Sequence, residues 1–478
     1  MPRIYTPLVC CCLLLMAAAS SAEQPPNIVF IMADDLGYGD LGCYGQQRIA
    51  TPHLDRMAAD GVRFSQHYAG STVCAPSRCV LMTGKHLGHA EVRGNRSVSD
   101  TSEQPLEDAT LTIAEVLKGR GYATAIVGKW GLGDQHTSGF PNKQGFDYSF
   151  GYLGHWHAHN QYPEFLFRNG EKVYLNNFVP GARPSGAGNA TKREDYAGDL
   201  MIEEAREWIN QNHSKPFFLY LSLAVPHANN EAGDEGMQVP DYGPYKNRDW
   251  PQPQKGAAAA ITRMDSAIGG LLEQLETLGV ADNTLVVFTS DNGPHAEGGF
   301  DPEFFHSSGP LRGIKRDLYE GGVRVPMMAV WPAKIEPGSE SDTISGFQDW
   351  MATFADVAGA DAPKETDGVS LVPSLTGKGQ QQQHPYLYFE FYEQGGKRSV
   401  RVGPWKAVQL GMNSKKPRPV ELYNLDDDLG ERNNVAADHP EIVARLTREM
   451  DGARSDSPAY TFGAAADAEA ATVGPEGR

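Results

Sequence analysis

Two pairs of neighbouring oxygen-bearing side chains are the residues of this sequence best suited to bind a metal ion. Asp34 and Asp35 end the apolar run NIVFIMADD, and Asp291 and Asn292 follow the run LVVFTS. Adjacent carboxylates repel one another, and their buried charge needs a cation. Oxygen ligands alone suit Ca2+ or Mg2+ and do not suit Zn2+. The alternative is that each pair caps a following helix, because Asp and Asn are good N-cap residues.

A cysteine, Cys74, stands in the stretch VCAPSRCVLMTG, where we expect a helix to begin. Its soft thiolate is a poor ligand for Ca2+ or Mg2+ among carboxylates. No strong base motif flanks it to activate a thiolate nucleophile, and a disulfide to Cys79 would be strained within one helix. An oxygen nucleophile at position 74 would fit all of these neighbours.

Apolar runs with the composition of buried strands precede these chemical residues. Residues 27–35, 123–131, 216–229 and 285–293 do not alternate in polarity, as expected for a parallel sheet that is covered on both faces. Helical patterns lie between them, at residues 51–61, 111–122, 195–212 and 257–279. Ligands bind at the carboxyl ends of such strands, and there Lys129 and His227 join the two acidic pairs.

The order of these elements predicts an α/β protein with a large mixed, mostly parallel sheet sandwiched by helices, and a smaller C-terminal antiparallel α+β subdomain. We expect the catalytic domain at residues 23–378, the antiparallel-sheet subdomain at 379–456 and a low-complexity tail at 457–478. Residues 1–22 have the basic, apolar and small-residue regions of a signal peptide. We therefore expect export to the periplasm or the medium, with no membrane span and with lipidation at Cys10 disfavoured.

The composition is globular and argues against a nucleic-acid partner. The chain has 478 residues, of which 40% are hydrophobic and 21% charged, and its formal net charge is -18. An anionic substrate remains compatible with a locally basic site, because net charge describes the whole surface. Without the signal peptide, three cysteines remain, an odd number that leaves at least one unpaired or modified: Cys43, Cys74 and Cys79.

The segment from Cys74 to Gly84 matches the pattern C-x-P-S-R-x-x-x-x-T-G, and with it the chain resembles the type I sulfatases of the alkaline phosphatase superfamily. The resemblance covers most of the chain and includes GKWGLG, SDNG, RGIKRDLYEGGVRVP and ELYNLDDDLGERNN. It implies a sulfuric ester hydrolase of the arylsulfatase type. In that family a formylglycine-generating enzyme converts the cysteine to formylglycine, whose hydrate attacks the sulfur of a sulfate ester.

The resemblance also implies a role for each site residue. One divalent cation, usually Ca2+ and alternatively Mg2+, is coordinated by the modified residue 74 with Asp34, Asp35, Asp291 and Asn292. Arg78 stabilises the hydrate, and Lys129 and Lys315 hold the sulfate oxygens, where charge concentrates during the reaction. His227 donates a proton to the leaving alcohol, which suits a histidine with a pKa near neutrality. The alternatives are that the lysines are solvated surface charges and that His227 is a satisfied loop histidine.

Gly131 departs from the family pattern. Many members have histidine in G-K-W-H-L-G at this position, where it is credited with helping to cleave the hemiacetal, and this chain has GKWGLG. A subgroup of sulfatases carries glycine there too, so the change does not predict an inactive protein. His136, His86 and His89 are alternative bases among which the sequence does not decide.

The loop GHWHAHNQY contains three histidines and two aromatic residues that could contact a sugar. We predict His159 as the first substrate contact, with His157 and with His295 of SDNGPHAEGG as further ones. A packed loop is the alternative, and a Zn2+ site at His155, His157 and His159 is disfavoured because no Cys or Glu partner accompanies them. The glycine at 131 and this loop resemble sulfatases that act on 4-sulfated galactose or N-acetylgalactosamine.

Two other functions compete with a sulfatase acting on a sulfated carbohydrate. One is a phosphomonoester or phosphonate hydrolase of the same superfamily. The other is a non-catalytic glycan-binding relative, which the presence of Cys74, Arg78, Lys129, His227 and Lys315 argues against.

Overall fold

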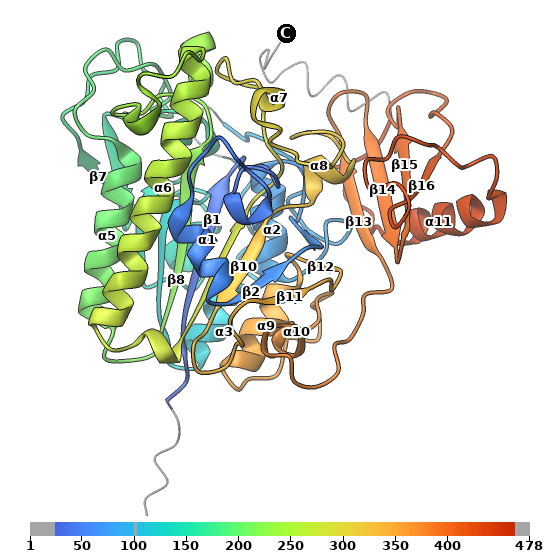
Figure 1. Ribbon diagram of the computed structural model, residues 1–478, viewed down its shortest axis with the longest axis horizontal. Helices are drawn as coiled ribbons and strands as arrows, with labels where there is room; N and C mark the ends of the chain where they lie inside the picture. Colours follow the sequence, from blue (N-terminus) through green and yellow to red (C-terminus); the bar gives the residue numbers. More distant parts are fainter. Residues whose placement is uncertain (1–23, 100–102, 464–478) are drawn as a thin grey trace, which may run out of the picture.

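The computed structural model describes residues 24–99 and 103–463 (Figure 1). The predicted signal peptide at 1–22 and residues 464–478 of the predicted tail lie outside the described residues. None of the described helices is long and apolar enough to cross a membrane.

A ten-stranded sheet forms the centre of the larger part of the molecule (Figure 1). Its order is β11 (Ser339–Ser341), β2 (Val62–Phe64), β10 (Met327–Val330), β9 (Thr284–Ser290), β1 (Asn27–Asp34), β8 (Phe217–Pro226), β4 (Ala123–Lys129), β5 (Tyr148–Tyr152), β6 (Phe165–Arg168) and β7 (Glu171–Tyr174). The run from β9 to β5 is parallel, whereas β10 is antiparallel to both of its neighbours and β6 to both of its own. The predicted mixed, mostly parallel sheet is therefore confirmed.

Helices cover both faces of this sheet because its central strands are apolar on both sides. In β1, Val29 and Ile31 face one core and Ile28 and Phe30 face the other. The first core contains residues of α1 (Pro52–Ala59), α5 (Ala197–Asn212) and α6 (Gln252–Thr277). The second contains residues of α2 (Cys74–Thr83), α3 (Ile113–Gly119) and α9 (Asp349–Val357). The four helical patterns of the sequence correspond to α1, α3, α5 and α6, and α6 begins earlier than its pattern because its first turn is polar.

A four-stranded antiparallel sheet forms the C-terminal part and confirms the predicted smaller antiparallel α+β subdomain. Its strands are β13 (Leu387–Phe391), β14 (Lys397–Val402), β15 (Trp405–Leu410) and β16 (Glu421–Asn424), and α11 (Pro440–Gly452) packs on one face through Leu446 and Met450. The predicted hairpin turn at Gly395 and Gly396 joins β13 to β14. The domain boundary predicted at residue 378 falls between α10 (Val372–Thr376) and β13.

The C-terminal sheet lies against the site-bearing part through an apolar contact. Phe389 and Phe391 of β13 pack with Tyr68 and Val73, the residue that immediately precedes Cys74. A buried ionic contact accompanies it, in which Lys406 Nζ lies 2.8 Å from Glu320 Oε1. The subdomain therefore supports the segment that leads into α2.

Candidate active site

Neighbouring ends of parallel strands bring the predicted site residues together, as expected for such a sheet. The register pairs Asp34 of β1 with Pro226, the last residue of β8, and Ala33 with Ser290, the last residue of β9. β4 ends at Lys129 on the other side of β8. The residues that follow or end these strands therefore meet at one edge of the sheet.

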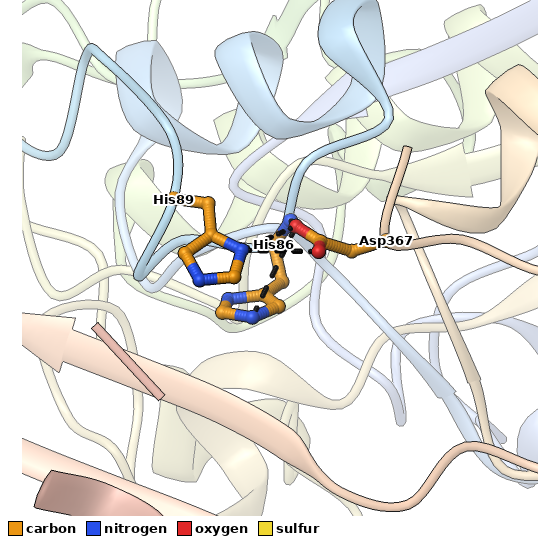
Figure 2. Close-up of side chains that lie close together, drawn as sticks. All are labelled: His86, His89 and Asp367. Atoms are coloured by element: carbon orange, nitrogen blue, oxygen red, sulfur yellow. Dashed lines mark hydrogen bonds and ion pairs between the residues drawn. The ribbon is translucent and has the colours of Figure 1, made fainter. Parts of the chain in front are cut away.

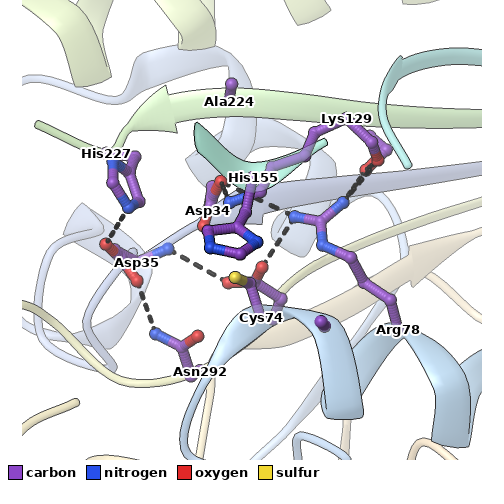
Figure 3. Close-up of polar contacts among 12 residues, drawn as sticks. Asp34, Asp35, Cys74, Arg78, Lys129, His155, Ala224, His227 and Asn292 are labelled. Atoms are coloured by element: carbon purple, nitrogen blue, oxygen red, sulfur yellow. Dashed lines mark hydrogen bonds and ion pairs between the residues drawn. The ribbon is translucent and has the colours of Figure 1, made fainter. Parts of the chain in front are cut away.

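Asp34, Asp35 and Asn292, which Figure 3 labels, form one fully buried cluster together with Asp291. The backbone N–H of Asp35 donates to Asp291 Oδ1 at 3.1 Å, and Asn292 Nδ2 donates to Asp35 Oδ1 at 2.7 Å. Asp35 has a φ of 67°, in the left-handed region that side chains rarely adopt. Such backbone strain persists where the surrounding structure imposes it, and it is concentrated at functional sites.

The cluster has the donor chemistry of a hard divalent cation site. Asp34 Oδ1 and Asn292 Oδ1 are buried and have no hydrogen-bond partner among the residues that the structure describes. Buried oxygens of this kind are costly unless a further group binds them. Asp34 and Asp35 also lie in a group of metal-ligating atoms with His227, within 4.8 Å of one another. The residues present therefore fit Ca2+ or Mg2+.

Each carboxylate of the cluster has a basic side chain within 3 Å. Lys129 Nζ lies 2.7 Å from Asp34 Oδ2, Arg78 Nη2 lies 2.6 Å from Asp291 Oδ2, and Lys315 Nζ lies 2.8 Å from Asp35 Oδ2. All six side chains are buried. Ion pairs in this environment are weakly screened, so the positive groups hold fixed positions at the base of the site.

The pKa values of the carboxyls follow from these charges. Burial opposes ionisation of Asp34, but the charges of Lys129, His227 and Arg78 lower its pKa below the usual range. Burial and the neighbouring charge of Asp34 raise the pKa of Asp291 to about 7. The pKa shifts of Asp34 and Asp291 are opposite in direction because the two carboxylates repel each other when both are charged. A divalent cation would relieve this repulsion.

Cys74 is the first residue of α2, as the sequence predicted. Burial raises the pKa of its thiol despite the nearby Lys129, so the unmodified residue is a protonated thiol and a weak nucleophile. Asn95 Nδ2 donates to Cys74 Sγ at 3.4 Å, and Asn95 Oδ1 accepts from the backbone N–H of Ala75. Cys74 and Cys79 are not bonded to each other.

Arg78 is held in place by three further acceptors besides Asp291. Its Nη1 donates to the carbonyl oxygen of Lys129 at 2.6 Å and to Ser222 Oγ, and Asp34 Oδ2 lies 3.7 Å from Nη2. Ser222 in turn donates to the Lys129 carbonyl oxygen at 2.7 Å. Sequence analysis missed Ser222, because a serine inside an apolar strand carries no distinctive signal.

His227 lies between the basic groups and Asp35. Its Nδ1 donates to the carbonyl oxygen of Ala228 at 2.7 Å, so its Nε2 accepts from Lys315 Nζ at 3.3 Å. Burial and the charge of Lys315 lower the pKa of His227 to about 3, which differs from the near-neutral value expected from the sequence. The Lys315 ammonium, beside an unprotonated Nε2, is therefore the adjacent source of protons. Lys315 also contacts Glu297 at 3.1 Å, a carboxylate that sequence analysis missed.

The histidine loop forms a short helix, α4 (His155–Ala158), and contributes two of its three histidines to the site. The rings of His159 and His227 stack with centroids 5.0 Å apart. The rings of His227 and His295 also stack, with centroids 6.2 Å apart. His159 Nδ1 also lies 3.3 Å from Glu231. His155 pairs with Glu103, with Nδ1 2.5 Å from Oε1.

His157 is placed differently from its predicted role as a substrate contact. Its ring is 2% exposed and lies among the rings of Tyr152, Phe165 and Phe167, with centroids 4.9, 4.7 and 5.9 Å away. In a helical turn, alternate residues point to different sides, so His157 enters the core where His155 and His159 do not. We therefore withdraw His157 from the substrate contacts.

The candidate bases that were predicted in place of a histidine at 131 lie away from the site. His86 and His89 follow the C-terminal end of α2, and Cys74 is at its other end, about 15 Å along the helix. They meet Asp367, with His89 Nδ1 3.0 Å from its carboxylate and the two rings 4.1 Å apart (Figure 2). His136 is exposed on the loop after β4.

This second histidine cluster has the hydrogen-bond pattern of a structural contact. The backbone N–H of Gly88 donates to His86 Nδ1 at 3.1 Å, so the neutral ring carries its proton on Nε2, 3.9 Å from Asp367 Oδ2. A metal ion on Nε2 would displace this proton and leave Nδ1 without one, which a neutral imidazole does not allow. The backbone N–H of His86 donates to the same carboxylate at 2.9 Å, which ties the loop after α2 to Asp367.

The fold and this constellation define a hydrolase of the sulfatase type, and comparison with known proteins agrees. A family model described as Sulfatase matches residues 26–360, and one described as N-sulphoglucosamine sulphohydrolase, C-terminal, matches residues 314–456. Arylsulfatase A of Homo sapiens is 34% identical over 485 residues, which cover 92% of this chain and 89% of that protein. The chain belongs to the type I sulfatases of the alkaline phosphatase superfamily and is a sulfuric ester hydrolase.

Two further relatives are named for carbohydrates. The N-acetylgalactosamine-6-O-sulfatase of Bacteroides thetaiotaomicron is 29% identical over 503 residues, covering 90% of this chain and 93% of that protein. The crystal structure of Ps i-CgsB in complex with k-i-k-neocarrahexaose superposes with a TM-score of 0.75 at 26% identity, covering 94% of this chain and 97% of that one.

Proposed function

We propose that this protein hydrolyses a sulfate monoester of a carbohydrate at residue 74, after conversion of Cys74 to formylglycine by a formylglycine-generating enzyme. One arrangement carries this proposal: Cys74 opens α2 beside a buried oxygen cluster, and three basic side chains surround the same point. A helix N-terminus also favours an anionic oxygen there. When formed, the hydrated aldehyde supplies the oxygen nucleophile that a buried thiol does not.

The cation site is proposed for Ca2+, with Mg2+ as the alternative. Asp34, Asp35, Asp291 and Asn292 would hold it together with residue 74, and the cation would supply charge that stabilises the nucleophile and a sulfate oxygen. The unpartnered oxygens of Asp34 and Asn292 support this assignment. Ca2+ accepts flexible geometries of six to eight oxygens, whereas Mg2+ demands a near-ideal octahedron.

The basic residues and His227 are proposed to bind the sulfate group, orient residue 74 and protonate the leaving oxygen. Lys129 and Lys315 are proposed to hold the sulfate oxygens, and Arg78 to orient residue 74. The leaving sugar oxygen needs a proton as its bond to sulfur breaks. The Lys315 ammonium, which already donates to His227 Nε2, is proposed to supply this proton, and His227 Nε2 to orient it as the acceptor.

The substrate is proposed to be a sulfated N-acetylgalactosamine or galactose residue, with His159 and His295 as its contacts. Their stacked rings next to His227 would place the sugar beside the proton source. The histidine loop and Gly131 favour a 4-sulfate. The relative from Bacteroides thetaiotaomicron is named for a 6-O-sulfate. We place the 6-position first because that relative matches 90% of this chain. Export through the segment at 1–22 would bring the enzyme to polysaccharide outside the cytoplasm.

Kinetics on matched substrates test this function. We expect kcat/KM to be higher on N-acetylgalactosamine 6-sulfate than on the 4-sulfate, and higher on an aryl sulfate than on the corresponding aryl phosphate. The Cys74→Ala variant, measured in parallel, should lose all turnover because it cannot be modified. Preference for the phosphate ester, or full activity in Cys74→Ala, would reject the proposal.

A further inference from the structure

Gly131 leaves space in the site, and a carboxylate faces that space. A Cβ at position 131 would lie 3.5 Å from Glu103 Oε2 and 3.7 Å from Arg78 Cδ, so nothing fills this position directly. Gly131 has a φ of 81°, in the left-handed region that favours glycine, so the local backbone disfavours any side chain there. A group that acts in place of a side chain at 131 must therefore come from another segment.

Glu103 holds a histidine at this space. Its Oε1 accepts from the backbone N–H of His155 and lies 2.5 Å from His155 Nδ1. Contact with a carboxylate at this distance places the imidazole proton on Nδ1. His155 Nε2 therefore carries the lone pair.

The pair is buried and fixed. The side chains of His155 and Glu103 are 6% and 4% exposed. Burial opposes ionisation of Glu103, but His155 and the charge of Lys129 lower its pKa, so it is a carboxylate at neutral pH. A carboxylate and an imidazole with Nδ1–H and a lone pair on Nε2 form the arrangement that enzymes use to orient a general base. Figure 3 draws the His155 ring among the labelled residues of the site.

We propose that Glu103 and His155 form the base of the second half of the reaction, with His155 Nε2 as the acceptor. This inference rests on the proposed function at residue 74. After the sulfate group has moved to residue 74, the remaining hydroxyl gives its proton to Nε2. The electron pair of that O–H bond forms the C=O bond of the aldehyde, and the C–O bond to sulfate breaks with its pair leaving on sulfate. No oxidant or reductant takes part.

A second carboxylate–histidine pair on the same loop provides an internal comparison. His159 contacts Glu231 at 3.3 Å and stacks on His227, so it belongs to the side of the site where the leaving sugar is proposed to lie. His155 is joined through Glu103 to the space at Gly131, beside Arg78. The two pairs are therefore assigned to different steps, His159 to substrate contact and His155 to release of sulfate.

Rapid kinetics with 4-nitrophenyl sulfate test this assignment in His155→Gln, with His159→Gln as the matched variant. In His155→Gln we expect a burst of one nitrophenolate per modified site, followed by turnover about 10²- to 10⁴-fold slower than in the parent protein. Cold acid quenching and trypsin digestion should give the peptide from Phe64 to Arg78 heavier than its aldehyde form by one SO3 plus one H2O. His159→Gln should show neither the burst nor the adduct, and its KM for a sulfated sugar should rise.

Each other outcome overturns the assignment. Unchanged turnover in His155→Gln excludes His155 as the base, and slow turnover without burst or adduct places it in the first step or in folding. Glu103→Gln, which keeps an acceptor oxygen for Nδ1, should show the same burst and a smaller loss of turnover. This variant replaces His155→Gln in the test if His155→Gln does not fold. The mass of the peptide before substrate is added reports modification of Cys74, so a failure of the proposed function is recognised separately.

Discussion

Replacement of Asp291 by asparagine should remove most of the stabilisation that this protein gains from Ca2+. Asp291 shares the buried cluster with Asp34 and Asp35, and its Oδ1 is fixed by the backbone N–H of Asp35. Asparagine keeps the shape of the side chain and removes one carboxylate charge. The substitution also removes the charge that pairs with Arg78, which changes the stability of the metal-free protein. Only the difference in unfolding free energy with and without Ca2+ is therefore compared between the variants.

The magnitude follows from mass action. At a Ca2+ concentration 100 times the dissociation constant, binding to the folded state stabilises the parent protein by about 2.7 kcal/mol. Loss of a direct ligand should weaken binding at least as much as loss of an outer-shell partner, about 100-fold. The same Ca2+ concentration then equals the new dissociation constant and contributes about 0.4 kcal/mol. The expected loss of Ca2+-dependent stabilisation is therefore about 2.3 kcal/mol.

Thermal unfolding in EDTA and in Ca2+, together with calorimetric titration of the ion, measures this loss. Both are done in Cys74→Ala protein, so that incomplete modification of residue 74 does not enter. Asp265→Asn is the control, because Asp265 is equally buried but accepts from the backbone N–H groups of His53 and Leu54 in another part of the fold. An unchanged Ca2+ shift in Asp291→Asn, or an equal loss in Asp265→Asn, would refute the assignment of the cation site.

Three further predictions concern single residues. The tryptic peptide that contains residue 74 should resist thiol alkylation in protein made with the modifying enzyme, and a fully alkylatable thiol there would contradict formylglycine. His227→Gln should lower turnover of a sugar sulfate about 10²- to 10⁴-fold and that of 4-nitrophenyl sulfate far less, because nitrophenolate leaves without a proton; equal losses would exclude a role in leaving-group protonation. Burial lowers the pKa of His86 to about 4 from 6.5, so its contribution to stability is complete above pH 6.5 and is lost as the pH falls toward 4, by about 3 kcal/mol. Urea unfolding at pH 7 and pH 4.5 should show a smaller drop for His86→Gln, and an equal drop would show that other groups dominate.

The strand ends were predictable because their composition is distinctive. β1 and β9 are buried along their whole length, so their sequences are continuously apolar and stop abruptly at Asp34 and Asp291. Parallel pairing then fixes which ends meet, without knowledge of any side-chain contact. The same logic located Lys129, since β4 ends there.

Residues that act from loops were not predictable in this way. Asn95 and Glu103 lie outside the described helices and strands, and their partners Cys74 and His155 are far away in the sequence. Their roles depend on contacts between distant parts of the chain, which no local pattern encodes. The role predicted for His157 was wrong for a related reason. The composition of a loop does not distinguish a turn of helix from an extended segment.

The charges of the site explain why a divalent cation is needed as well as three basic residues. Three carboxylates are matched by three basic side chains, Arg78, Lys129 and Lys315, and Lys315 also contacts Glu297, so the cluster by itself has no positive charge left for an anion. An ionised oxygen nucleophile and a sulfate monoester together bring two negative charges to this point. A divalent cation held by these carboxylates would balance both charges, and Lys129 and Lys315 would then be available to the sulfate oxygens. The contacts of Arg78 with the Lys129 carbonyl and Ser222 do not involve the carboxylates, so they would hold Arg78 beside residue 74 if Asp291 bound the cation.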